Sequence, residues 1–278
     1  MAKANYVSFY GQVLQDPQLK MTTKSEIVQG RIILKVLRRF SDENRKLEFS
    51  TPMIITGRPA IANQMTKLKK GDMCFLKGVI TTMNVTRSWI CECGYTNQPV
   101  GTYTIITPLF IEKTEGLSDK FNAAKNTEDL IESEGIKSLK THNEISNTVH
   151  VIGTVCNTQP LFDNGVSASF NFQIAVNRRF RIVDANSDPD IRTDYPWVRL
   201  FGDAAREAAK VLDINSTVFI DGSFYTKMVS KKSYCDKCNK EHIIKELVSE
   251  IHPYSVEYLH NCNLPEKAYT EDYSSIDM

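Results

Sequence analysis

Hydrophobic and polar residues alternate along several short stretches of this chain, which is the pattern of strands with one buried and one solvated face. The clearest stretch is Phe170-Asn-Phe-Gln-Ile-Ala-Val176, in which the odd positions of the pattern are large and apolar. An earlier stretch, residues 31–36, repeats the alternation. We expect its even-numbered residues to be buried and its odd-numbered residues, Arg31 and Lys35 among them, to form an outward face that is basic.

The same order of motifs occurs twice, about 140–145 residues apart, which indicates an internal repeat. With a helical stretch in each copy, six matches in one order predict two copies of one fold. The matched segments are Tyr6-Val-Ser-Phe-Tyr-Gly11 with Val149-His-Val-Ile-Gly153, Leu37-Arg-Arg-Phe40 with Asn177-Arg-Arg-Phe180, Ile54-Ile-Thr-Gly57 with Arg199-Leu-Phe-Gly202, Phe75-Leu-Lys-Gly78 with Phe219-Ile-Asp-Gly222, and Trp89 ahead of Cys91 with Tyr234 ahead of Cys235.

Each copy predicts a small β-barrel. It contains five strands, one short helix after the third strand (residues 59–68 or 203–212) and a long final hairpin. These are the elements of an OB-fold, whose strand 2–3 face and loops bind oligonucleotides. The predicted fold class is therefore all-β with one short helix per domain, arranged as two tandem OB-fold barrels. The expected divisions are domain 1 at 1–115, a polar linker at 116–147, domain 2 at 148–260 and a flexible acidic tail at 261–278.

Composition and charge exclude several classes of protein. With 41% apolar and 24% charged residues, 10 Pro and 13 Gly, the chain is not disordered or collagenous. It has no run of 18 apolar residues and its start lacks a secretory signal, so we expect a cytoplasmic protein without membrane contact. The formal net charge of +1 hides an uneven distribution: residues 1–115 hold 16 basic and 9 acidic side chains, whereas residues 261–278 hold 1 and 4.

Two motifs of the second copy resemble the single-stranded DNA-binding protein (SSB) family of bacteria and phages. Phe172-Gln-Ile-Ala-Val-Asn-Arg-Arg-Phe180 is similar to that family's second strand. Asp194-Tyr-Pro-Trp-Val-Arg-Leu-Phe-Gly202 and the helix that follows are similar to its third strand and helix. The resemblance covers residues 148–260 well and 5–113 more faintly. It implies a non-enzymatic protein that coats and protects single-stranded DNA, without sequence specificity, during replication, recombination or DNA transfer.

Binding a single strand needs flat side chains that stack on bases beside cations that meet phosphates. The resemblance implies such positions in the second copy, and the repeat transfers them to the first. There Thr56 stands where the second copy has Phe201, and a threonine cannot stack on a base. The candidate nucleic-acid-binding residues are Arg31, Lys35, Arg38, Arg39, Phe40, Phe49, Arg87 and Trp89 in the first copy, and Arg178, Arg179, Phe180, Tyr195, Trp197, Phe201, Lys231, Lys232 and Tyr234 in the second.

Core packing is the competing interpretation of each aromatic residue, since large apolar side chains are usually buried. Trp197 shares strand parity with Tyr195 and Phe201, and either the core or the binding face fits it. The motif Arg-Arg-Phe, however, recurs at residues 38–40 and 178–180. Burying two guanidinium groups beside each Phe would cost desolvation energy with no partner evident in the sequence. We therefore expect both motifs to be exposed and to face an anionic ligand.

Four of the seven cysteines form two close pairs, which favours metal binding over disulfides. Cys235 and Cys238 have the two-residue gap suited to one tetrahedral zinc, with His242 as a further candidate ligand, and Cys91 and Cys93 lie one residue closer. We hypothesise that the two final hairpins meet and share one structural Zn²⁺ ion held by all four thiolates. The alternatives are one site per barrel, a site completed by another chain, or no metal.

Catalytic motifs are weak or missing in the sequence. His142-Asn-Glu144 and the later CxxC pair imitate the zinc deaminase signature, but about ninety residues separate them. The chain has no phosphate-binding loop, nucleophile elbow or dinucleotide-binding fingerprint. We therefore expect no enzymatic activity. The isolated Cys74 and Cys156 are expected to be buried as small hydrophobic residues.

The resemblance also implies an assembly and partners. Family members commonly use four barrels, so two chains of this kind would suffice and a homodimer is expected. The family's acidic tail recruits replication or recombination proteins, and the end of this chain, residues 271–278, is acidic but only loosely similar. A bacterial cell is the expected setting, with the gene on a chromosome, a phage, or a plasmid or other mobile element. The alternative functions are a zinc-containing OB-fold scaffold or an RNA-binding module in a replication or transcription complex, or an enzyme of unrecognised type.

Overall fold

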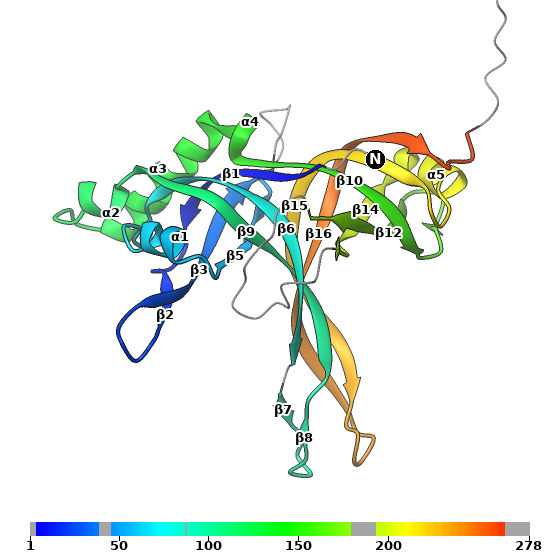
Figure 1. Ribbon diagram of the computed structural model, residues 1–278, viewed down its shortest axis with the longest axis horizontal. Coiled ribbons are helices and arrows are strands. Elements are labelled where there is room, and N and C mark those ends of the chain that lie inside the picture. Colours follow the sequence, from blue (N-terminus) through cyan, green and yellow to red (C-terminus); the bar gives the residue numbers. More distant parts are fainter. Residues whose placement is uncertain (1–3, 39–45, 87, 179–192, 265–278) are drawn as a thin grey trace, which may run out of the picture.

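The computed structural model describes residues 4–38, 46–86, 88–178 and 193–264, and most of them lie in strands. The strands form two barrels that lie side by side and are joined through one continuous sheet (Figure 1). The expected fold class, all-β with few helices, is confirmed. Among the described helices, none has the length and hydrophobicity needed to cross a membrane.

The first barrel comes from residues 5–115. Its helix follows β5 and is three residues shorter than the sequence pattern predicts. The elements are β1 (Asn5–Val13), β2 (Gln18–Met21), β3 (Ile27–Leu37), β4 (Phe49–Ser50), β5 (Met53–Thr56), α1 (Pro59–Met65), β6 (Met73–Thr86), β7 (Trp89–Ile90), β8 (Thr96–Asn97) and β9 (Val100–Glu115).

The second barrel repeats this order over residues 147–260. Its helix again follows the third long strand of the copy. The elements are β10 (Asn147–Thr158), β11 (Phe162–Asp163), β12 (Ala168–Asn177), β13 (Thr193–Asp194), β14 (Trp197–Phe201), α5 (Gly202–Val211), β15 (Thr217–Tyr234) and β16 (Glu241–His260).

The predicted alternation defines the two cores. Ile32, Leu34 and Val36 are fully buried on β3, and the apolar positions of residues 170–176 are buried on β12. The intervening side chains of both strands are half-buried and face outward. The outward face of each barrel is therefore the surface left for a ligand.

The first strands of the two copies, β1 and β10, pair with each other in antiparallel register. Val7 lies opposite Val149 in this pair, and Val7 also pairs with Gly78 while Val149 pairs with Gly222. Val7 and Val149 therefore occupy equivalent positions, and the pairing is unchanged when the copies are exchanged. The repeat detected in the sequence is an approximately two-fold symmetric pair in space.

Gly78 and Gly222 permit the close approach of the two long strands in each copy, at the point where their register shifts. A Cβ atom at Gly222 would lie 2.5 Å from the carbonyl oxygen of His252, and one at Gly78 would lie 2.7 Å from that of Thr107. Glycine marks such bulges because it has no side chain to collide with the neighbouring strand. The matched motifs thus end on glycine for the same steric reason.

The segment between the barrels is helical and lies against the first barrel. It contains α2 (Leu117–Lys120), α3 (Thr127–Thr141) and α4 (Asn143–Ser146). The hydroxyls of Tyr10 and Ser138 are 2.7 Å apart, and Ser146 Oγ donates to the backbone oxygen of Tyr10 at 2.8 Å. Leu139 is fully buried at this contact. The polar linker expected from the sequence is therefore a folded cover on one end of the first barrel.

Two long hairpins extend beyond the barrels in the same direction (Figure 1). The first arm, residues 83–86 and 88–103, is formed by the far halves of β6 and β9 and carries β7 and β8 near its tip. The second arm, residues 228–248, is formed by the far halves of β15 and β16. Each arm is the final hairpin of its copy, and each carries one of the two cysteine pairs, Cys91 with Cys93 on the first arm and Cys235 with Cys238 on the second.

Candidate nucleic-acid interface and metal site

The outward face of the second barrel is formed by β12, β14, β16 and β15. The register places Trp197 opposite Gln173 on one side and Glu250 on the other. Side chains two residues apart on a strand share a face, so this face also carries Arg199 and Phe201. Trp197 is half-buried on the outward face, outside the core. Core packing, one of the two alternatives that the sequence left open for Trp197, is therefore excluded, and a role of this residue in binding stays a prediction.

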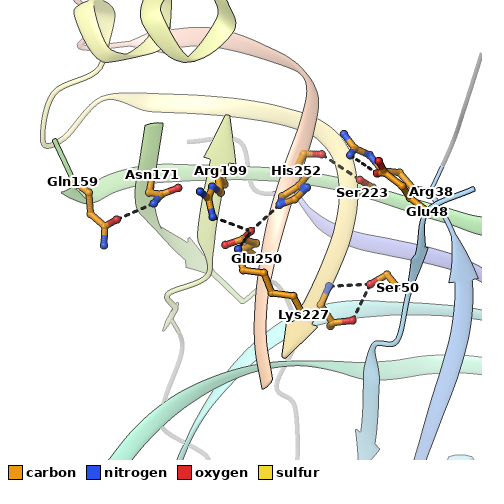
Figure 2. Close-up of polar contacts among 11 residues, drawn as sticks. Arg38, Glu48, Ser50, Gln159, Asn171, Arg199, Ser223, Lys227, Glu250 and His252 are labelled. Carbon is orange, nitrogen blue, oxygen red and sulfur yellow. Dashed lines mark hydrogen bonds and ion pairs between the residues drawn. The ribbon is translucent and has the colours of Figure 1, made fainter. Parts of the chain in front are cut away.

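An ionic cluster lies on this face and joins three strands (Figure 2). The Glu250 carboxylate lies 2.8 Å from Nε2 of His252 and 2.9 Å from Nζ of Lys227. A guanidinium nitrogen of Arg199 lies 3.9 Å from the same carboxylate. Glu250 is nearly buried, so these neighbours stabilise its charge in a poorly solvated position.

Aromatic rings lead from this cluster toward solvent. The His252 ring stacks on Tyr225 with centroids 4.4 Å apart and meets Phe201 nearly edge-on at 5.2 Å. The Arg199 guanidinium lies 5.2 Å from the centroid of the Phe201 ring. Phe201 is 47% exposed. A flat ring that reaches solvent beside a cation is the arrangement that single-strand binding requires.

Burial and charge set the ionisation of this cluster. Burial lowers the pKa of His252 below its ordinary value of 6.5, although the neighbouring Glu250 opposes this effect. Burial raises the pKa of Glu250, but hydrogen bonds from His252 and Lys227 outweigh it, so the net pKa is lowered. At neutral pH Glu250 is therefore charged and His252 neutral. His252 then donates its Nε2–H to Glu250, which leaves Nδ1 as an acceptor.

Most of the buried side-chain polar atoms without a hydrogen-bond partner in the described residues lie on the outward faces of the barrels, and one lies at the tip of the first arm. In the described part of the chain, three of them belong to Asn171, Arg199 and His252 on the second barrel, and the others are Nε of Arg31 and Nε1 of Trp89. Buried polar groups in folded proteins are almost always paired. A set of unpaired groups on one surface is expected where a ligand supplies the missing partners.

Several predicted binding residues of the second copy are exposed. Tyr195 and Tyr234 are 45% and 53% exposed, and Lys231 is also exposed. Lys232 is exposed and forms an ion pair of 2.9 Å with Glu241 across the second arm. Two further predicted residues, Arg179 and Phe180, lie outside the described residues.

Arg178 is buried, and the expectation that both guanidinium groups of its motif face solvent is wrong. Its side chain is 4% exposed and donates two hydrogen bonds, of 2.6 and 2.7 Å, to the fully buried carboxylate of Asp194. The same carboxylate accepts hydrogen bonds from the backbone N–H and the hydroxyl of Thr82 in the first copy. The argument from desolvation failed because Asp194 supplies the partner that the motif alone does not reveal.

On the first barrel, two predicted cations are already paired within the protein. Lys35 is 15% exposed, and its ammonium lies 2.9 Å from Glu132 of α3 and 4.8 Å from the ring centroid of Phe49. Arg38 forms an ion pair of 2.8 Å with Glu48. Glu132 of α3 and Glu48, which precedes β4, therefore pair with two cations that the sequence analysis assigned to phosphate binding.

Arg31 differs, because it borders an open groove on the outward face of the first barrel. The groove has a volume of about 510 Å³ and lies over β2, β3, β5, β6 and β9. Thr56, the counterpart of Phe201, is fully buried and does not contribute to it. The remaining predicted residues of this copy, Arg39, Phe40 and Arg87, lie outside the described residues.

Three residues on these surfaces were missed by the sequence argument: Tyr103, Arg199 and His252. Arg199 shares strand parity with Trp197 and Phe201, so the alternation along β14 would have identified it. Tyr103 and His252 belong to the final hairpins, whose register with the remaining strands is not visible in the alternation. Only the folded sheet places Tyr103 at the groove of the first barrel and His252 beside Phe201.

The four paired cysteines meet where the tips of the two arms come together. The ligand atoms of Cys91, Cys93, Cys235 and Cys238 all lie within 4.8 Å of one another. The Cys91–Cys238 sulfurs are 3.6 Å apart and the Cys93–Cys235 sulfurs 3.8 Å apart. Zinc–sulfur bonds of about 2.3 Å in a tetrahedron place sulfurs about 3.8 Å apart. The arrangement therefore suits one four-coordinate metal ion shared by both copies.

Other contacts hold the two arm tips together. Nε2 of His242 lies 3.2 Å from Sγ of Cys91, and its ring centroid lies 4.7 Å from that of Trp89, which is half-buried. The backbone N–H of Asp236 donates to Oδ1 of Asn97 at 2.9 Å. These contacts pair residues of the first arm with residues of the second. His242 thus packs beside the cluster while the four thiols form its centre.

The local backbone favours a thiolate at Cys235. Burial raises the pKa of this thiol, but hydrogen bonds from the N–H groups of Cys238 and Lys237 and from the Asn97 amide outweigh it and bring the pKa to about 6. A thiolate is the form that binds metal. Of the isolated cysteines, Cys74 is buried as expected, whereas Cys156 is exposed, contrary to expectation.

Comparisons with known proteins agree with this geometry. Residues 146–250 match the model of the single-strand binding protein family. No curated protein matches the sequence significantly. The wild-type single-stranded DNA binding protein from Thermus aquaticus has a similar structure, with a TM-score of 0.58 and 15% identity over 93% of this chain and 95% of that one. A deletion mutant of the Thermus aquaticus protein gives a TM-score of 0.57 and 15% identity, over 96% and 100% of the two chains.

The two kinds of comparison establish different things. At 15% identity the structural similarity concerns the fold, and it extends over both barrels. The family match concerns the sequence, and it falls on the second barrel, which carries the motifs of strand, loop and helix described above. Residues 146–250, which include most of the second barrel, are thus similar in sequence to the single-strand binding protein family, and the whole chain is similar in fold to the Thermus aquaticus protein.

Proposed function

We propose that this chain binds single-stranded DNA without catalysing a reaction, and that it uses the outward faces of both barrels. The observation that carries the proposal is the half-exposed Phe201 ring beside Arg199, next to polar atoms that lack partners. Stacking on a ring tolerates every base, because each base has a flat face. Binding would therefore depend on backbone charge and stacking, with little dependence on sequence.

The domain division is part of this proposal. Residues 1–115 and 148–260 would act as two binding domains, and the helices between them would belong functionally to the first. The ion pair between Lys35 and Glu132 supports this assignment, because it joins α3 to β3. The two domains would differ, since the first offers a groove bordered by Arg31 and the second an exposed ring.

Intrinsic fluorescence tests the proposal directly. The chain has two tryptophans, and both Trp89 and Trp197 border the hollows that a strand would fill. Titration with oligo-dT should quench their emission at low salt, and duplex DNA of equal length should quench it far less. Equal quenching by oligo-U would favour the RNA-binding alternative. If neither the tryptophan emission of the protein nor its electrophoretic mobility changed with any of these nucleic acids, the proposal would be wrong.

We further propose that the four-cysteine cluster holds one structural Zn²⁺ ion. Four thiolates without another ligand are typical of structural zinc sites, which have no open coordination position. The ion would supply a rigid link between the arm tips, and the chain's own residues would supply all four ligands. Binding of the ion would release thiol protons, so its affinity would rise with pH.

A homodimer with four barrels is also proposed. The surface of the continuous sheet opposite the core carries partly exposed rings, among them Tyr6, His150 and Phe219, whose centroids follow one another at 6.4 and 6.2 Å. Contiguous exposed aromatic surface is typical of association sites. Sedimentation with and without a long oligonucleotide measures the stoichiometry, and a monomer in both states would exclude the dimer.

A further inference from the structure

Two grooves of this protein meet at a single residue, Tyr103. The first-barrel groove, of about 510 Å³, covers the outward face of the first barrel. The inter-arm groove, of about 660 Å³, lies between β9, the second arm and the edge of the second barrel at Trp197. Tyr103 lines both grooves. It is half-buried on β9, where it pairs with Met83 of β6.

The first-barrel groove has the chemistry of a nucleotide site. Its walls are apolar over Met53, Ile55 and Met83, and its charged side chains are those of Lys20 and Arg31. None of its described lining residues is acidic. Nε of Arg31 is buried without a hydrogen-bond partner. Apolar walls suit bases, and an unpaired guanidinium nitrogen suits a phosphate or a base edge.

The inter-arm groove continues this surface toward the second barrel. Its lining includes Trp197 of β14 and Lys231 and Lys232 of the second arm. A smaller hollow of about 90 Å³ adjoins it, since Lys231 and Glu246 line both, and this hollow reaches Trp89. The inter-arm groove thus carries two rings, Tyr103 and Trp197, and two lysines beside the acidic Glu246, and it links the first-barrel groove to the edge of the second barrel.

We propose that Tyr103 stacks on a base at the point where one continuous single strand passes from the first barrel to the second. The inference rests on the proposed binding of single-stranded DNA and adds the path of the strand. In this arrangement Tyr103 supplies to the first barrel the ring that Thr56, buried in the core, does not supply. The two barrels then hold one strand jointly, and Tyr103 is the residue common to both parts of the path.

The path makes a prediction about oligonucleotide length. An oligonucleotide that fills one barrel does not have to pass from one barrel to the other. An oligonucleotide that spans both barrels must pass Tyr103. A single OB-fold holds about 4–16 nucleotides. We therefore compare oligo-dT of about 6 and about 35 nucleotides, binding to the wild type, Tyr103→Ala and Tyr103→Phe.

Tyr103→Ala should lower the affinity for the long oligonucleotide by about 5- to 150-fold, the range for loss of one stacked base. Its affinity for the short one should stay close to the wild type, and Tyr103→Phe, which keeps the ring, should bind both as the wild type does. Phe201→Ala should weaken both lengths, because its ring lies within one barrel. Wild-type affinity for long oligo-dT unchanged by Tyr103→Ala would overturn the path and leave the proposed function intact.

A second measurement uses the wild-type chain and does not depend on the variants folding. Oligo-dT carrying 5-iodouracil is irradiated in the complex, because this base crosslinks to aromatic rings stacked on it. The path predicts crosslinked peptides that contain Tyr103 when the oligonucleotide is long. Crosslinks confined to the Phe201 and Tyr195 peptides would exclude the crossing, and no binding by the wild type would instead remove the proposed function.

Discussion

The sulfur atoms of Cys91 and Cys238 are 147 positions apart in the chain and 3.6 Å apart in space. The first belongs to the final hairpin of one barrel and the second to the final hairpin of the other. Their contact brings the tips of the two arms together. A metal ion at this point would therefore act on the shape of the whole binding surface.

Purified protein should contain about one zinc ion per chain, because four thiolates complete one tetrahedral site. Cys91→Ser or Cys238→Ser should lower the metal content sharply, as measured by elemental analysis. Cys156→Ser is the matched control, since Cys156 is an exposed cysteine outside the cluster. A wild-type metal content near zero, with DNA binding indifferent to a chelator, would contradict this prediction.

Removing the metal should loosen the arm tips while the barrels stay folded. The barrels have their own buried cores, whereas the tips are held by a few contacts such as that of Asp236 with Asn97. Hydrogen exchange of residues 89–97 and 235–242 should accelerate after chelation, and exchange of β1 and β10 should not. Unchanged protection at the tips would show that protein contacts alone hold the arms together.

Arg178→Ala should destabilise the fold by about 3–5 kcal/mol, because it leaves the buried Asp194 carboxylate with its hydrogen bonds from Thr82 but without the cation that balances its charge. The free energy of unfolding in urea measures the effect. Arg206→Ala is the control, since its ion pair with Asp163 is partly exposed and such pairs contribute about 0–1 kcal/mol. If the two variants lost equal stability, Arg178 would have no special structural role.

Arg31→Gln should reduce the salt dependence of DNA binding. Each phosphate neutralised on a single strand contributes about −0.7 to the log–log slope of affinity against salt, and Arg31 has no ion-pair partner among the described residues. Arg206→Gln should leave the slope unchanged, since its guanidinium is paired with Asp163 and Asp203. A slope equal in the wild type and in Arg31→Gln would place the phosphates elsewhere.

Stability should fall as the pH drops below about 6.5, in part because of His252. Its folded pKa is lowered by burial, with Arg38 and Lys227 adding to the effect, so the unfolded chain binds this proton more readily. The contribution of neutral His252 is complete above the unfolded pKa and is lost at lower pH. His252→Gln should therefore flatten the dependence of unfolding free energy on pH between about 5 and 7. An equally steep dependence in the variant would assign the effect to other groups.

Much of the local structure follows from the order of residues. The alternation in residues 170–176 identified the buried side of β12, and the matched glycines at 78 and 222 fell at equivalent bulges. Local patterns succeed here because a strand has a period of two and a bulge needs a residue without a side chain. The same reasoning predicted the shared cysteine cluster, because neither pair alone completes a tetrahedron.

Arg178 shows where such reasoning ends. Its neighbours in sequence give no sign of Asp194, which reaches it only after β13 pairs with β12. Lys35 is similar, because its partner Glu132 lies on a helix that the sequence suggested as a linker. Whether a cation is free for a ligand depends on contacts between distant segments.

The sequence by itself determined two copies of one barrel, their buried strand faces and the residues able to ligate a metal, since periodicity and spacing are local properties. Only the tertiary structure decided which charges are paired, which rings reach solvent and that Tyr103 borders both grooves. These depend on the register between strands far apart in the chain, and that register is set by packing of the whole sheet.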